Sequence, residues 1–126
     1  MGTAQAGTTT LSLRATEVFH ELKDLPPVGI TNPGDKLIYT ERLTSNGKLV
    51  GYSYWTLGFN GTDYPLDAVT KLSGGTLRVH GVMHGLTPPS SLRITGGTGK
   101  YAGARGSLTF RPLTTLVTVE TYTIRR

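Results

Sequence analysis

Cysteine is absent from the sequence. Its absence excludes disulfide frameworks, thiolate nucleophiles, iron–sulfur clusters and cysteine-type zinc sites. The sequence also lacks an apolar run of the roughly 18 residues that span a bilayer, and its first residues have neither the basic nor the apolar segment of a secretion signal. These absences predict a protein that works in the cytoplasm and does not associate with membranes.

Charge is sparse and scattered. Charged residues make up 17% of the chain, and 13 lysines and arginines against 8 acids leave a formal charge of +5. The basic residues fall singly except for the adjacent pair Arg125 and Arg126. A nucleic-acid-binding protein usually carries a basic stripe or patch. The dispersed pattern therefore predicts that nucleic acid is not a partner.

Glycine and proline are frequent, with 17 and 7 residues among 126, and the chain is long enough for one hydrophobic core. We expect a flexible N-terminal segment at residues 1–10 and a single domain at residues 11–126. Apolar and polar residues alternate with the period of a β-strand, and Asn-Gly and Gly-Gly pairs between the alternating runs indicate hairpin turns. The predicted strands are residues 11–23, 36–44, 48–59, 64–72, 76–84, 91–95, 106–111 and 114–124.

The proline-rich segment 24–34 is predicted to be the longest loop, because proline removes backbone donors from strands and helices. Eight short strands joined by local turns predict an all-β fold, an eight-stranded antiparallel up-and-down β-barrel about wide enough to hold one small ligand or to be filled by its own side chains. Closure of the sheet into a barrel removes its exposed edges. An open β-sandwich is the structural alternative.

Glycines cluster in the segment 91–106. Gly97, Gly99 and Ala102 fit a loose dinucleotide-binding fingerprint, but that motif opens a helix after a parallel strand, and the later glycines disfavour a helix here. A phosphate-binding loop does not fit either, because Lys100 is not followed by serine or threonine and no glycine stands five residues before it. We interpret the glycines as a bulge or a bend where two backbones approach closely.

The run from Ser91 to Gly106 contains Ile-Thr-Gly-Gly-Thr-Gly, an aromatic residue and Gly-Ala-x-Gly. It resembles the signature shared by allene oxide cyclases and dirigent proteins. The resemblance covers about residues 11–126 and is closest to bacterial allene-oxide-cyclase-like barrels of polyketide pathways, including the spirotetronate-forming Diels–Alder cyclases. It implies an eight-stranded barrel with a cavity, commonly in an oligomer.

Two acids are the main catalytic candidates. Glu17 lies nine residues before Pro26, the spacing at which allene oxide cyclases carry a glutamate on their first strand, and Glu41 stands where those proteins have an asparagine. If both point inward, burial in an apolar cavity raises the pKa of a carboxyl and suits it to acid–base work. The alternative is a structural ion pair between a buried glutamate and Arg78.

His80 and His84 are the other catalytic candidates. On a strand their Cα atoms are separated by roughly 13 Å, too far to share one metal ion, so no metal is expected. By register with the family's fifth strand, both face the interior. The alternative is that they are structural histidines or lie at the rim of the barrel.

The same reasoning places an aromatic and apolar lining inside the barrel, which is typical of a small-molecule pocket. The predicted substrate-binding residues are Phe19, Tyr39, Ser53, Trp55, Leu57, Arg78, Val82 and Leu86. Alternate residues should face outward, and outward aromatic side chains favour a homodimer or homotrimer, although single exposed apolar residues are also common on monomers. The residues expected outside are Val50, Tyr52, Tyr54, Val117 and Val119.

Together with the predicted apolar lining, the resemblance implies a cofactor-independent cyclase or isomerase that folds a linear, mostly apolar, polyketide-like substrate so that a ring closes stereoselectively. Confinement and orientation supply most of such catalysis. One alternative is a dirigent-like binding protein, without chemistry of its own, that holds a reactive intermediate made by another enzyme. The other is a small-molecule carrier or an inert oligomeric module.

Overall fold

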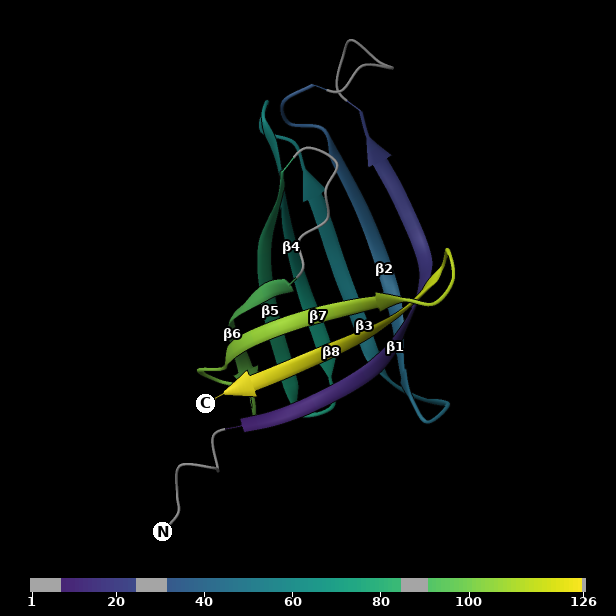
Figure 1. The fold of residues 1–126 in the computed structure, drawn as a ribbon, viewed down its shortest axis with the longest axis vertical. Helices are drawn as coiled ribbons and strands as arrows, with labels where there is room; N and C mark the ends of the chain where they lie inside the picture. The colour runs from purple at the N-terminus through teal and green to yellow at the C-terminus, as the bar shows by residue number, and fades with distance from the viewer. Residues whose placement is uncertain (1–7, 25–31, 85–90, 126) are drawn as a thin grey trace.

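A computed structural model describes residues 8–24, 32–84 and 91–125. These residues form eight antiparallel strands that close in sequential order into a barrel (Figure 1). The predicted up-and-down barrel is thus confirmed. The strands are β1 (Thr8–Lys23), β2 (Lys36–Ser45), β3 (Lys48–Gly58), β4 (Asp63–Leu72), β5 (Gly75–His84), β6 (Ser91–Gly99), β7 (Arg105–Pro112) and β8 (Val117–Arg125).

Three strand boundaries differ from the expected ones by three residues or more, and one of them is the start of β8, at Val117 rather than at residue 114. β1 begins at Thr8, because residues 8–10 pair with the end of β8, so part of the expected flexible segment belongs to the barrel. β6 continues through the glycine run to Gly99 rather than ending at residue 95. Residues 1–7 lie outside the described part of the chain.

The tight turn between β2 and β3 follows from its sequence. Asn46 and Gly47 both have positive φ, 52° and 79°, as a two-residue hairpin turn requires. The pairing of the two strands fixes which side chains face the interior, because directly opposed residues share a face of the sheet. Glu41 pairs with Ser53, and Tyr39 pairs with Trp55.

Apolar side chains fill one half of the barrel. Leu43, Leu77, Ile94 and Leu108 are fully buried there and come from strands all around the barrel. Burial of apolar area at about 25 cal/mol per Å² is the main stabilising contribution of such a core. No helix in the described residues is long and apolar enough to cross a membrane.

Among the described residues, the other half of the barrel is walled by β1 to β5 and not by β6 to β8. Pairing of β8 with β1 ends at Thr16, and pairing of β6 with β5 ends at His80. β1 to β5 extend past these points, as Figure 1 shows, whereas β7 and β8 cross only the lower half of the view. The sheet of β1 to β5 therefore presents its inner face at the mouth of the barrel.

The glycine-rich segment has the close backbone contacts predicted for it. A Cβ on Gly97 would stand 2.5 Å from the carbonyl oxygens of both Thr76 and Tyr101, so backbone occupies the space of a side chain. The register between β5 and β6 shifts at Arg78 and Val79, beside this segment. The glycine spacing therefore corresponds to a bend with close backbone contacts and not to a nucleotide-binding loop.

Candidate active site

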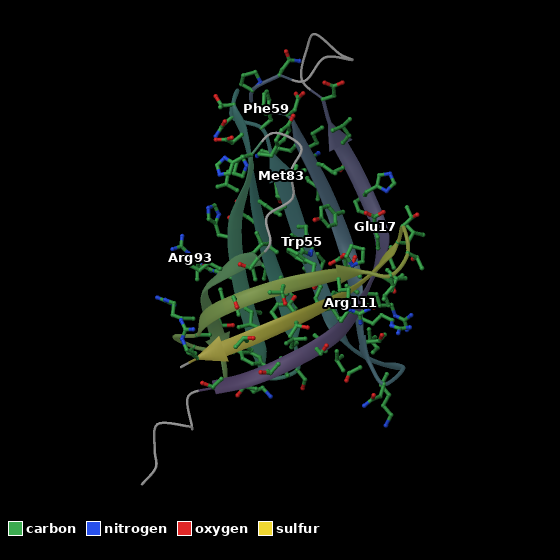
Figure 2. All side chains as sticks on the ribbon, viewed as in Figure 1. Glu17, Trp55, Phe59, Met83, Arg93 and Arg111 are labelled. Atoms are coloured by element: carbon green, nitrogen blue, oxygen red, sulfur yellow. The ribbon has the colours of Figure 1, made fainter. Side chains whose placement is uncertain are left out.

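A cavity of about 290 Å³ opens toward the mouth of the barrel. Its walls are mostly apolar and aromatic. Tyr39 and Trp55 stack with parallel rings whose centroids are 5.7 Å apart, and Phe110 contacts Trp55 at 6.2 Å in a tilted arrangement. Figure 2 shows Trp55 and Met83 within the outline of the barrel. The lining residues are Tyr39, Glu41, Trp55, Leu57, Leu66, Met83, Phe110, Pro112, Thr118 and Glu120.

Two carboxyl groups lie on the cavity wall, from strands on either side of β1. Glu41 on β2 is 8% exposed and Glu120 on β8 is 1% exposed. The hydroxyl of Ser53 donates to Glu41 Oε1 over 3.1 Å, and Trp55 Nε1 donates to Ser53 Oγ over 2.9 Å. The position of one carboxyl is therefore tied to the indole that forms the cavity wall.

Glu120 has its own chain of donors. The Tyr122 hydroxyl donates to Glu120 Oε1 over 3.0 Å, and Thr70 Oγ1 lies 2.8 Å from the same hydroxyl, to which it can donate in turn. All three side chains are buried. Because buried polar groups are costly when unpaired, this chain fixes the orientation of the Glu120 carboxyl.

Burial raises the pKa of Glu120 well above its ordinary value, and the hydrogen bond with Glu41 and the charge of Glu41 raise it further. The hydrogen bond from Tyr122 acts in the opposite direction and is the smaller influence. Two carboxyls in contact in an apolar setting retain a proton between them, because two adjacent negative charges repel. The pair can therefore both donate and accept a proton.

The two tyrosines beside the pair are proton donors. Burial, followed by the charges of Glu41, Glu120 and Glu17, raises the pKa of Tyr39. Burial and the charge of Glu120 raise the pKa of Tyr122. Both phenols therefore keep their protons at neutral pH. Tyr39 lines the cavity and can polarise a carbonyl oxygen there, whereas Tyr122 donates its proton to Glu120.

The alternative of an ion pair between a buried glutamate and Arg78 is not realised. Arg78 is exposed and lies along a shallow groove on the outer surface with Tyr54 and Asp67. The described lining of the cavity includes no lysine or arginine. Hydroxyl and indole donors, rather than a cation, stabilise the carboxyl pair.

The predicted inward face of β5 is wrong. Its apolar residues Leu77 and Val79 are buried, so the alternate residues Arg78, His80, Val82 and His84 lie on the outer face. The physical reason is that burying two aliphatic side chains is favourable, whereas burying cationic or polar ones without partners is costly. The prediction had followed the register of the fifth strand in the resembling family and not this local alternation.

Both histidines of β5 pair with aspartates across the strands. His80 Nδ1 lies 2.7 Å from Asp67 Oδ1, and His84 Nδ1 lies 3.0 Å from Asp63 Oδ1. These outer pairs are remote from the carboxyl pair in the barrel, so neither histidine is a catalytic candidate. Among the described residues, no group of three or more His, Asp or Glu side chains could hold a metal ion.

A bulge in β1 overturns another prediction. Glu17 pairs with Glu41, but the next pair is Phe19 with Thr40, which leaves Val18 as an extra residue. Phe19 is consequently 53% exposed instead of lining the cavity. Glu17 lies on the inner side as predicted, near the mouth, and its backbone N–H donates to the carbonyl of Leu116 over 2.9 Å.

The remaining predictions have mixed outcomes. Tyr39, Trp55 and Leu57 line the cavity as expected, and Ser53 is buried beneath it. Tyr52 and Tyr54 are exposed as expected. Val50 packs against the core instead of facing outward, because the register of β2 and β3 shifts nearby. Val117 and Val119 alternate with the cavity residues of β8 and are half-buried, and Leu86 lies outside the described residues.

Sequence reasoning missed Glu120 and Tyr122. The signal was present in the last strand, where Tyr122 and Ile124 alternate with threonines. Placing Val117 and Val119 outward assigns Glu120 to the inner face, two residues from Tyr122. An acid in register with buried apolar residues is the pattern that indicates a candidate catalytic group.

The chain matches no protein-family model and no curated protein in sequence. It is similar to solved structures of the same architecture. A pyocyanin demethylase superposes with a TM-score of 0.78 at 25% identity over 92% of this chain and 99% of that one.

Two of the similar structures are cyclases. A nonspecific heme-binding cyclase that catalyses a (4 + 2) cycloaddition during neoabyssomicin biosynthesis gives a TM-score of 0.76 at 16% identity, over 94% of this chain and 66% of that one. The Diels Alderase AbmU from Streptomyces koyangensis gives 0.71 at 14% identity, over 94% and 68%. At these identities the similarity establishes a shared barrel fold. The resemblance to allene oxide cyclases and dirigent proteins stays a prediction.

Proposed function

We propose that this protein is a cofactor-independent cyclase of natural-product biosynthesis that closes a ring within a mostly apolar, unsaturated substrate. The observation that carries the proposal is the buried carboxyl pair of Glu41 and Glu120 on the wall of an aromatic cavity. The barrel that holds them has the fold of two Diels–Alder cyclases. A cavity of about 290 Å³ lies at the lower end of ligand-pocket volumes, so it suits the reacting segment of a substrate.

The cavity would act first by confinement. A diene and its partner held together against the flat Tyr39 and Trp55 surface react as one molecule, and such orientation is worth about 7–11 kcal/mol of the barrier. The protonated member of the carboxyl pair donates a hydrogen bond to a carbonyl conjugated with the partner alkene. This bond draws electron density from the alkene, and it strengthens as charge moves toward oxygen in the transition state.

The test replaces each carboxyl separately. Glu41→Gln and Glu120→Gln keep the size of the side chain and an N–H donor but cannot transfer a proton. If the acidic O–H of the pair polarises the substrate carbonyl, we expect turnover to fall by about 10² to 10³-fold with little change in substrate binding, because an amide N–H is a weaker donor. The assay uses linear polyenes that carry a carbonyl-activated alkene and follows loss of polyene absorbance together with a product of unchanged mass.

Glu21→Gln is the matched control, since Glu21 is exposed on the same sheet and pairs with Lys23 at 3.6 Å. Near wild-type turnover in both Gln variants, with loss of turnover in Trp55→Ala, would mean that confinement alone drives closure and that the acid–base roles are wrong. A wild-type protein that accelerates no closure, and only alters the product ratio of a reaction begun by an oxidase, would favour the dirigent-like binder.

A second candidate function follows from the parallel stacking of Tyr39 and Trp55 together with the similar pyocyanin demethylase. A flat aromatic surface beside a carboxyl pair suits a planar heteroaromatic substrate. Pyocyanin itself is the probe. Saturable quenching of the fluorescence of Trp55, the one tryptophan of the chain, and loss of a methyl group from the dye would favour this candidate over the cyclase.

We also propose that the protein assembles through the outer face of β3. Tyr52 and Tyr54 are 36% and 43% exposed there, and Lys71 Nζ stands 5.4 Å from the centroid of the Tyr54 ring. Light scattering is expected to report a dimer or trimer at micromolar concentration. The double variant Tyr52→Ser with Tyr54→Ser is expected to shift the association equilibrium toward monomer. A wild-type protein that is strictly monomeric would contradict this assembly.

A further inference from the structure

The inner face of the barrel stays apolar beyond the cavity. Leu57 on β3 and Leu66 on β4 line the cavity and pair with each other across the two strands. Leu57 also pairs with Leu37 on β2, and Leu37 pairs with Leu22 on β1. Directly opposed residues in an antiparallel pair share a face of the sheet, so these leucines all lie on the inner face. We call Leu22, Leu37, Leu57 and Leu66 the leucine row.

The leucine row is buried at its cavity end and exposed at its outer end. Leu66 is 8% exposed, whereas Leu22 is 63% exposed. Leu37 and Leu57, which lie between them, are half-buried. Among the described residues, the pairing of β8 with β1 ends at Thr16, short of Leu22. One continuous apolar surface therefore leads from the cavity wall to the mouth.

An aromatic pair extends this surface along the barrel. Phe59 directly follows β3, and its ring centroid lies 4.9 Å from that of Tyr64 on β4. Tyr64 pairs with Met83, which lines the cavity, so Tyr64 is on the inner face. Figure 2 shows Phe59, Met83 and Trp55 in succession from the upper end of the view to its middle. Four residues of a strand span roughly 13 Å, so the apolar surface runs about that far beyond Trp55.

The cavity holds only part of a substrate of the proposed kind. Its volume is about 290 Å³, below the roughly 300–1,000 Å³ of common ligand pockets. The rest of such a molecule leaves through the mouth, where the leucine row is the adjoining wall. An apolar group gains free energy by leaving water there, whereas a charged group loses its hydration without finding a partner among the leucines.

We propose that the leucine row binds an unbranched apolar chain attached to the reacting segment and selects substrates by the length of that chain. This role rests on the proposed function, because it places the reacting segment in the cavity. Leu22 and Leu37 determine specificity without touching the reacting atoms. Each methylene that lies on the row removes apolar area from water, so affinity rises with chain length until the chain extends past the row.

The test uses methyl n-alkyl ketones as probes. Their carbonyl group accepts a hydrogen bond in the cavity, and the members of the series differ only in chain length. Calorimetry measures the dissociation constant of each ketone from the butyl to the nonyl compound. In the wild type we expect each added methylene to tighten binding about two- to fourfold, since full burial of a methylene corresponds to about fourfold.

Leu22→Ser and Leu37→Ser should reduce the gain in affinity per methylene, but only for chains long enough to reach the substituted residue. The butyl ketone should bind both variants as it binds the wild type. Because Leu22 is mostly exposed, its variant keeps the test informative if Leu37→Ser fails to fold. Leu49→Ser is the matched control, since Leu49 is 48% exposed at the start of β3, away from the mouth. We expect it to leave the whole series unchanged.

Equal gains per methylene in the wild type and in the variants of the row would overturn this role, and so would a series in which no ketone binds. An equal loss in Leu49→Ser would also overturn it, because the effect would not come from the row. The two proposals can fail separately. If Glu120→Gln loses turnover while the variants of the row keep the wild-type gain, the cyclase stands and the chain-binding role fails. If the variants lose the gain but the wild type closes no polyene, the chain-binding role stands and the cyclase fails.

Discussion

Replacing Gly106 by alanine should prevent stable folding. Gly106 has φ of +144°, which side chains rarely adopt, and a Cβ there would stand 1.8 Å from the carbonyl oxygen of Thr123. The neighbouring atoms are backbone of β8, so relief requires separating β7 from β8. We expect a loss of about 4 kcal/mol or more, which is a large part of the 5–15 kcal/mol that typically stabilises a domain. Calorimetry and urea unfolding measure it.

Two glycines of the same segment are matched controls. A Cβ on Gly96 meets nothing closer than Arg105 Nη1 at 3.8 Å, so Gly96→Ala should change the free energy of unfolding by no more than about 0.5 kcal/mol. Gly103 has open space but φ of +77°, so Gly103→Ala should cost about 1–2 kcal/mol from backbone strain alone. A Gly106→Ala protein with wild-type stability would contradict the register of β7 and β8.

Stability should fall as pH rises, and Glu120→Gln should remove much of that dependence. The folded-state pKa of Glu120 is raised above the ordinary value of 4.5. The folded protein therefore holds a proton that the unfolded chain releases. The stability that this proton contributes is fully present below the pKa of Glu120 in the unfolded chain. It is lost as pH rises through the pKa of Glu120 in the folded protein. Between these two pKa values, one proton lowers the free energy of unfolding by at most about 1.4 kcal/mol per pH unit.

Glutamine cannot ionise, so the variant should be more stable than the wild type at high pH. At low pH it should be less stable by about 1–3 kcal/mol, because one amide hydrogen of the buried side chain is left without an acceptor. Plots of the free energy of unfolding against pH for the wild type and for Glu120→Gln should therefore cross. Urea unfolding at a series of pH values, followed by Trp55 fluorescence, measures both, with Glu21→Gln as the control that keeps the wild-type slope. Parallel curves for wild type and Glu120→Gln would contradict the shared proton.

The fold could be predicted because it depends on short-range signals. Alternating hydrophobicity defined the strands, and the left-handed Asn46 and Gly47 specified their hairpin. The glycine segment was correctly interpreted as a site of close backbone contact. Each of these features depends on neighbouring residues alone, so no knowledge of the partner strand was needed.

The site could be predicted only in part, because it depends on which face each strand turns inward. On β2 and β3 the alternation is regular apart from the shift at Leu43 and Thr44, and Glu41, Tyr39 and Trp55 were placed correctly. On β1 the extra residue at Val18 reverses the alternation partway along the strand, and an unpaired residue leaves no trace in hydrophobic pattern. On β5 the alternation of Leu77 and Val79 was the better guide than the family register.

The ends of β1 and β5 near the mouth should open more readily than the rest of the barrel. Beyond Thr16 and His80, the described parts of β1 and β5 each have a ladder partner on one side only. Segments with fewer inter-strand hydrogen bonds open locally at lower free energy than a fully laddered core. Amide hydrogens near the mouth should thus exchange with deuterated solvent sooner than those around Glu120. We therefore expect the rim to widen more readily than the base, so that a ligand larger than the resting cavity enters without unfolding of the barrel.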